Sequence, residues 1–97
     1  MGQLDEIRIR AEIFQEGDQY VAICPELTVS SFGDTKIEAL KSFQEAVSLF
    51  LEECQRLGTL KQVLEEAGFS HVATPTHQWL SPKPIGVEQV SLSVVHA

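Results

Sequence analysis

YVAICPELTVSSFGDTKIEA, residues 20–39, decides the fold of this 97-residue chain. Its first part, residues 20–24, is rich in β-branched and aromatic side chains and predicts a strand. Pro25 ends that strand, because proline has no N–H to donate to a central ladder. Residues 28–32 form a second, weaker β pattern that suits a sheet edge. The turn at residues 33–35 then starts a long helix.

This helix is predicted to be amphipathic and capped at both ends. Thr35 and Glu38 form a T-x-x-E capping box, and Gly58 supplies the C-terminal stop. Apolar residues recur at three- and four-residue steps: Ile37, Leu40, Phe43, Val47, Phe50, Leu51, Cys54 and Leu57. About 22 residues would span roughly 33 Å. That length exceeds a short three-stranded sheet, so we expect the far end to pack on a second element.

The flanking segments complete the predicted order. Residues 7–14 alternate with period two and predict a half-buried strand, and residues 15–19 predict a hairpin loop around a glycine. Thr59 and Gln62 form a second capping box, which predicts a short helix that Gly68 closes.

The end of the chain is predicted to be irregular and then extended. Residues 70–84 contain three prolines and show no periodicity, so they predict a surface connection. Residues 85–95 alternate again and predict a fourth strand, placed beside the first by a right-handed crossover. The sequence thus predicts a single α+β domain over residues 1–97, with a βββ-α-α-β order and a core over about residues 5–69. Its architecture would be a two-layer sandwich, an antiparallel meander with the last strand added after the helices.

The net charge of the chain indicates which classes of partner it can bind. Seven Lys and Arg residues against fourteen Asp and Glu residues give a formal net charge of −7. Residues 1–34 hold seven of these acids and two arginines. Such a surface repels phosphate backbones, so we expect no direct binding of nucleic acid. A basic protein is the natural electrostatic complement, although mild acidity that serves only solubility is an equal alternative.

The sequence contains no cysteine or histidine pattern typical of a catalytic or metal site. Cys24 and Cys54 form no C-x-x-C pair and suit buried thiols in a reducing cytoplasm. The three histidines fall in the tail, without the spacing of a metal site. We therefore expect no enzyme activity, no metal and no cofactor. The N-terminus has no signal-peptide pattern, and no stretch has the length of a membrane span.

The spacing of these turns and caps resembles the HicB-like antitoxin family. Residues 20–27 resemble the family's aromatic, apolar run and Pro-Glu-Leu unit, and residues 33–35 resemble its Gly-Asp-Thr turn. Glu38-Ala39, Glu45-Ala46-Val47 and Leu49-Phe50-Leu51 resemble its long helix, so that the likeness covers about residues 7–57. Two features depart from the family. Thr28-Val29-Ser30 replaces a common Pro-Gly-Cys turn, and the helix-turn-helix or ribbon-helix-helix module of many members is absent.

The resemblance implies a partial RNase H-like fold and a protein that neutralises a small basic HicA-type toxin, an mRNA-cleaving enzyme. Expected docking residues are the acids of the first hairpin and of the 25–34 segment, together with three aromatic anchors. These residues are Glu16, Asp18, Tyr20, Glu26, Phe32, Asp34 and Trp79. Trp79 is expected to lack an obvious core position, because it lies in the proline-rich connection; packing back onto its own sheet or onto a second subunit is the alternative. For Tyr20, packing on the face of its own sheet is an equal alternative.

Two other functions stay open from the sequence. One is a stand-alone regulatory domain without a toxin, since an exposed edge strand in a small domain favours a homodimer or homotetramer. The other is a metal-dependent nuclease that uses the clustered acids, although the basic surface that a nuclease needs for its substrate is missing.

Overall fold

The structure is a computed structural model that describes residues 6–73 and 77–95. Three parts of the predictions lie outside these residues. They are the N-terminus with the predicted start of the core at residue 5, residues 74–76 of the predicted connection, and the predicted end of the domain at residues 96–97. The elements, in chain order, are β1 (Glu6–Arg8), β2 (Glu12–Glu16), β3 (Gln19–Cys24), β4 (Val29–Gly33), α1 (Lys36–Leu57), α2 (Leu60–Glu66), β5 (Ser70–Val72) and β6 (Gln78–Leu80). The predicted α+β class is confirmed.

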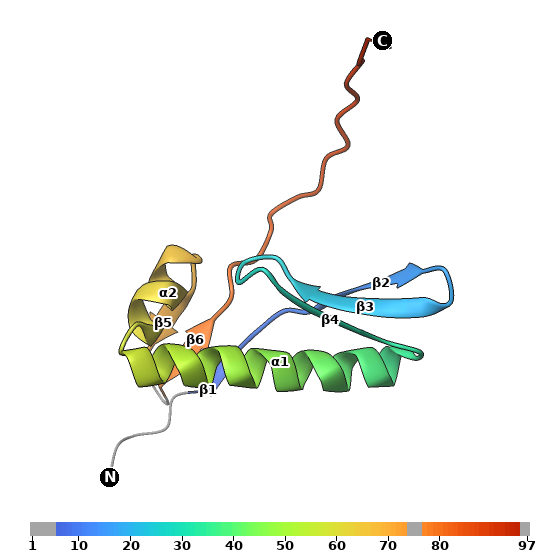
Figure 1. The fold of residues 1–97 in the computed structure, drawn as a ribbon. Helices are drawn as coiled ribbons and strands as arrows, with labels where there is room; N and C mark the ends of the chain where they lie inside the picture. Colours follow the sequence, from blue (N-terminus) through green and yellow to red (C-terminus); the bar gives the residue numbers. More distant parts are fainter. Residues whose placement is uncertain (1–5, 74–76, 96–97) are drawn as a thin grey trace.

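Strands β2, β3 and β4 form an antiparallel meander in that spatial order, and α1 packs across one face of it (Figure 1). Side chains alternate along β3, so that Ala22 and Cys24 point toward the helix and are fully buried. They join Ala39 and Phe43 of α1 in the main apolar core. As predicted, β4 lies at an edge of this sheet. The hairpin turn is shorter than predicted, because β2 and β3 reach to Glu16 and Gln19.

The predicted first strand is divided into two pieces. β1 pairs in parallel with β6, while β2 pairs antiparallel with β3. Residues 9–11 between them lie outside both strands, where the chain passes from one sheet to the other. The prediction of one continuous strand over residues 7–14 is therefore wrong, because alternation alone carries no information about which partner each half takes.

Both predicted caps of α1 are present. The Glu38 N–H donates to Thr35 Oγ1 at 3.1 Å, and the Glu38 carboxylate accepts from the Asp34 N–H at 3.0 Å. This return bond is one residue earlier than a capping box predicts. At the other end, Gly58 takes a left-handed conformation with φ 73°, which costs glycine little. Helix α1 spans 22 residues, and its far end packs on α2, as expected.

The second predicted capping box is not formed. Thr59 precedes α2 with φ −107° and ψ 2°, and its side chain caps no N–H of that helix. Its hydroxyl donates instead to the Cys54 carbonyl at 3.3 Å. Because only one residue separates Gly58 from α2, Thr59 must complete the end of α1, and this excludes the extended backbone that an N-cap needs.

Two short strands replace the irregular connection, and the last predicted strand is not formed. β6 lies between β1 and β5 in a second three-stranded sheet. Residues 81–95 have no strand assignment, and residues 83–95 are exposed. The strand that returns beside β1 is therefore Gln78–Leu80 and not residues 85–95. Within the described part of the chain, the alternation of residues 85–95 has no sheet to join.

Gly33 lies where β4 turns tightly into α1. A Cβ at this position would stand 2.6 Å from the Ala39 backbone N and 2.7 Å from Glu38 Cβ. Gly33→Ala is expected to destabilise the fold by about 1–3 kcal/mol, because the start of α1 must shift to make room. Urea unfolding of the purified protein measures this loss.

The matched control is Gly86→Ala, since no atom lies within 4 Å of a Cβ built at Gly86. Its free energy of unfolding should equal that of the wild type within about 0.5 kcal/mol. Equal stability of the two variants would contradict the close approach at Gly33.

Candidate protein-docking surface

The face of the β2-β3-β4 sheet that points away from α1 is named here the open sheet face. Alternation places eight residues on it: Glu12, Phe14 and Glu16 of β2, Gln19, Val21 and Ile23 of β3, and Ser30 and Phe32 of β4. None of the eight is basic. A shallow hollow of about 540 Å³ on this face is lined in part by Val21, Ile23 and Phe32. The sheet thus presents a concave, partly apolar surface.

An apolar row crosses all three strands of the open sheet face. Phe14 pairs with Val21, and Val21 pairs with Phe32, so the three side chains lie side by side. Phe14 is 52% exposed and Phe32 is 61% exposed. Large aromatic side chains that remain this accessible are typical anchors of protein interfaces.

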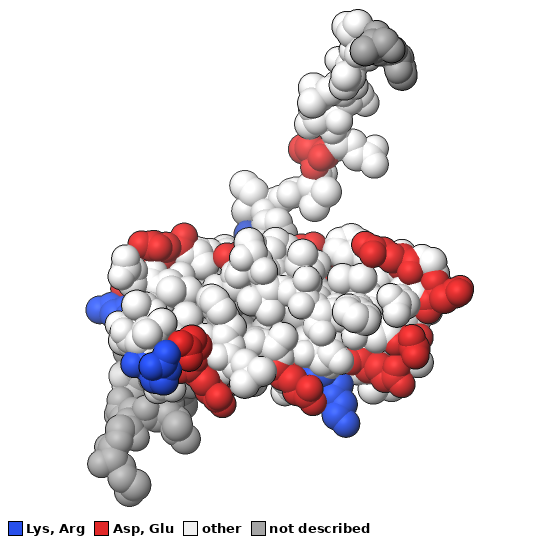
Figure 2. Space-filling view, in the orientation of Figure 1, with Lys and Arg blue, Asp and Glu red and all other residues white. Residues whose placement is uncertain are grey.

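One end of this sheet is strongly acidic. The register sets Tyr20 opposite Gly33, which brings the hairpin residues Glu16 and Asp18 to the same sheet end as Asp34. Figure 2 shows acidic side chains gathered at the end of the molecule where Figure 1 places the β2–β3 hairpin and the start of α1. Negative potential therefore borders the apolar row.

Glu26, in contrast, belongs to an internal network. Its carboxylate accepts from Arg10 Nη2 at 2.7 Å, and its side chain is only 11% exposed. Arg10 also donates to the Pro82 carbonyl at 2.9 Å, and the Cys24 thiol donates to Glu26 at 3.3 Å. Arg10, between β1 and β2, thus joins the turn after β3, through Glu26, to the segment after β6, through Pro82, and Glu26 serves the fold.

The Cys24 thiol lies beside that carboxylate and is fully buried. Burial, reinforced by the nearby Glu26, raises the pKa of the Cys24 thiol above its ordinary value of 9.0. Because the folded-state pKa is the higher one, the thiol's contribution to stability is complete below the unfolded pKa and is lost as pH rises through the folded pKa.

The free energy of unfolding of the wild type is therefore expected to fall more steeply between about pH 8 and 10 than that of Cys24→Ala. Urea unfolding at several pH values measures the slope of the free energy of unfolding against pH for both proteins. The loss of stability from removing the sulfur atom is the same at every pH, so it does not affect the comparison of slopes. Parallel slopes would contradict the raised pKa.

Two of the predicted anchors do not lie on the open sheet face. Tyr20 alternates with Ala22 and Cys24, so it points toward α1 and packs half-buried against the core. Trp79 is 6% exposed in β6, and its ring lies 4.7 Å from that of His71. The expectation that Trp79 lacks a core position is wrong, because β6 forms within the region that was predicted to be irregular.

The structure therefore brings together four of the seven predicted docking residues and separates three. Glu16, Asp18, Phe32 and Asp34 are exposed at or near one end of the sheet. Phe14 and Val21, which the sequence prediction missed, complete the apolar row. For Phe14 alone a signal was present, since it is out of phase with the alternating residues Ile7, Ile9 and Ile13.

Across residues 6–73 and 77–95, no three His, Cys, Asp or Glu side chains converge closely enough to hold a metal ion. Neither described helix combines the length and apolar character that crossing a bilayer requires.

Comparison with known proteins adds no relative. No protein-family model, curated protein or solved structure matches this chain.

Proposed function

We propose that this chain acts as a HicB-like antitoxin, a protein that binds and neutralises a small basic HicA-type mRNA-cleaving toxin. The observation that supports this proposal best is the open sheet face, where the Phe14–Val21–Phe32 row borders an acidic sheet end. The resemblance of residues 7–57 to the family supplies the identity of the partner.

The proposed mechanism is electrostatic and steric. The acids at the sheet end, including Asp18 and Asp34, would attract the lysines and arginines with which the toxin holds RNA. The apolar row would then be buried against the toxin and slow its dissociation. A toxin covered in this way cannot reach its substrate. The proposal requires no catalytic group on this chain, and it places the protein in the cytoplasm, where mRNA is found.

Co-expression in a host cell tests the proposal. A reading frame that lies beside this gene and encodes a small basic protein of the HicA type is induced alone or together with this chain. Growth arrest by the toxin alone and recovery with the chain are expected. Growth arrest that persists at equal expression of both proteins would contradict the proposal.

A second candidate function is a stand-alone oligomeric interaction domain without a toxin. The exposed apolar segment at residues 85–95 favours self-association. This candidate predicts that the chain assembles with itself and leaves the growth of toxin-expressing cells unchanged.

A further inference from the structure

The C-terminal arm, defined here as residues 85–95, leaves the body of the protein without packing on it (Figure 1). Its large apolar side chains are all highly exposed: Ile85, Val87, Val90, Leu92, Val94 and Val95. The radius of gyration of the chain is 16.5 Å, whereas a compact chain of this length has about 12.5 Å. So much exposed apolar surface indicates that the arm has a binding partner.

The pattern of the arm is that of a strand. Val90, Leu92 and Val94 alternate with Ser91 and Ser93, so that residues 90–94, when extended, have one apolar face and one polar face. Outside this stretch the pattern does not continue, because Ile85, Val87 and Val95 lie on the same face as the two serines. Glu88 is its only charged residue. An arm of this kind can add to the edge of a sheet that has an apolar layer on one side.

Such an edge is present on β2. In the order β2-β3-β4, the outer side of β2 has no neighbouring strand within its sheet. Ile13 of β2, on the helix side of the sheet, remains 38% exposed. The edge is therefore open both to backbone pairing and to apolar contact.

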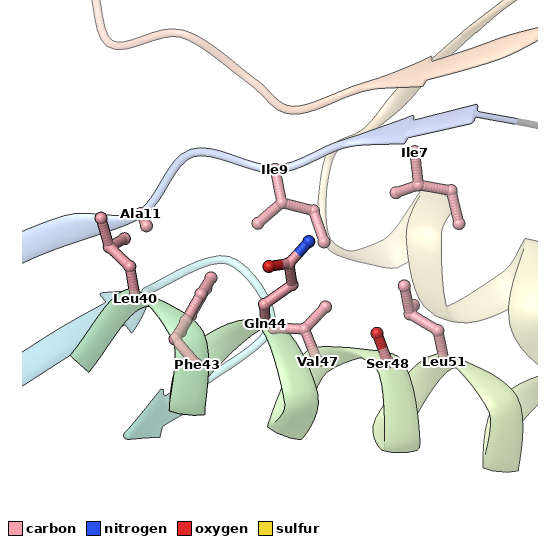
Figure 3. A pocket seen from close by; sticks show the side chains of 9 residues that line it. All are labelled: Ile7, Ile9, Ala11, Leu40, Phe43, Gln44, Val47, Ser48 and Leu51. Atoms are coloured by element: carbon pink, nitrogen blue, oxygen red, sulfur yellow. The ribbon is translucent and has the colours of Figure 1, made fainter. Parts of the chain in front are cut away.

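At the start of this edge lies a groove of about 510 Å³, named here the α1 groove (Figure 3). Seven of its nine lining residues are apolar, and the other two are Gln44 and Ser48 of α1. One wall is the chain from Ile7 to Ala11, and Figure 3 shows Ile9 pointing toward the helix. The other wall is α1, with Leu40, Val47 and Leu51 among the lining residues. The groove reaches the start of β2, since Ala11 directly precedes that strand.

The same chain is poorly placed to fill this position with its own arm. Continuing the register of β1 with β6, in which Arg8 is opposite Leu80, would set residues 84–88 beside β2. Pro84 has no N–H to donate, and Glu88 would stand opposite Glu16. The alternating residues 90–94 would then extend past the hairpin, away from the groove.

We propose that the C-terminal arm of one copy adds as a strand to β2 of a second copy. Val90, Leu92 and Val94 then face the α1 groove of that copy, and Ser91 and Ser93 face solvent. Reciprocal exchange of two arms closes a dimer around a twofold axis. This inference does not depend on a toxin, and the arm leaves Phe32, on the far strand of the open sheet face, accessible.

Light scattering during gel filtration of the full chain tests the exchange. The wild type should have twice the 10.8 kDa mass of one chain. Leu92→Asp should raise the dimer dissociation constant by about 100-fold or more, since it places a charge in an apolar interface. Ser93→Asp, the matched control on the polar face of the arm, should change it by less than about threefold. A monomeric wild type, or a Leu92→Asp dimer of unchanged affinity, would overturn the proposal.

Disulfide capture distinguishes a second copy from the arm's own chain. Leu40→Cys and Leu92→Cys proteins are mixed and oxidised, and a covalent heterodimer is expected. Leu57→Cys replaces Leu40→Cys as the control, because Leu57 is exposed and is not among the residues that line the groove. Failure to form the heterodimer, or a double variant that crosslinks only within one chain, would contradict arm exchange. Both measurements use the chain alone, so their failure leaves the proposed antitoxin function untouched.

Discussion

Changing Phe32 to aspartate is expected to weaken the complex with the HicA-type toxin by about 30- to 700-fold, equivalent to about 2–4 kcal/mol. Phe32 ends the apolar row of the open sheet face and is more exposed than Phe14 at the other end of the row. Loss of an aromatic anchor removes the burial of its ring in the complex, and the new carboxylate must be desolvated at the interface. Isothermal titration of the purified toxin into each variant measures the change.

The sign of this effect is informative, because Phe32→Asp makes an already acidic surface more acidic. If attraction of opposite charges alone drove association, the variant would bind a basic toxin at least as well as the wild type. Leu57→Asp is the matched control, since it adds the same charge at an exposed apolar position at the end of α1. Its affinity should remain within about threefold of the wild type. Equal losses in the two variants would exclude a specific role for the open sheet face.

Replacing Trp79 with alanine is expected to lower the free energy of unfolding by about 3–5 kcal/mol. The indole packs in the core cluster with Leu64 and Phe69, and it holds β6 against β1. A domain of this size is stable by only about 5–15 kcal/mol, so the variant should be close to the limit of folding. Urea unfolding followed by circular dichroism measures the loss, because Trp79 is the only tryptophan and its fluorescence disappears with it.

His71→Ala is the control for this variant. The His71 ring contacts Trp79 from an exposed strand, so its removal should cost less than about 1.5 kcal/mol. A Trp79→Ala protein as stable as His71→Ala would contradict the placement of Trp79 in the core.

Local signals in the sequence were sufficient for the last two strands of the meander and for the ends of α1. The Thr35 cap and the Gly58 stop are short-range features, and both form as expected. Within the predicted apolar stripe, Phe43, Val47 and Cys54 are buried, whereas Ile37 and Leu57 at its two ends are exposed. Pro25 ends the second strand of the meander for an equally local reason. These features depend on residues within a few positions of one another, so a pattern along the chain can reveal them.

The second sheet could not be predicted in the same way. β5 and β6 are three residues each, too short to show a period, and β6 forms because β1 offers a partner some seventy residues earlier in the chain. The reverse error occurred at residues 85–95, where a clear alternation has no partner in the described part of the chain. In both cases the presence or absence of a neighbouring strand, and not the alternation along the sequence, determines whether a strand forms.

The candidate site was predicted in part for related reasons. Glu16, Asp18, Phe32 and Asp34 could be placed near one sheet end from the order of strands and turns alone. The ion pair of Glu26 with Arg10 could not be predicted, because the two residues are distant in sequence. Phe14 and Val21 were missed because recognising the apolar row requires the register between strands, which sets Phe14 opposite Val21 and Val21 opposite Phe32.

The most direct test of the proposed function is inhibition of RNA cleavage by the toxin. Purified HicA-type toxin encoded beside this gene is incubated with RNA, and this chain is added in increasing amounts. The account predicts that an equimolar amount of wild type abolishes cleavage and that Phe32→Asp needs a large excess. Cleavage that continues at saturating wild-type protein, or equal protection by Phe32→Asp, would contradict neutralisation through the open sheet face.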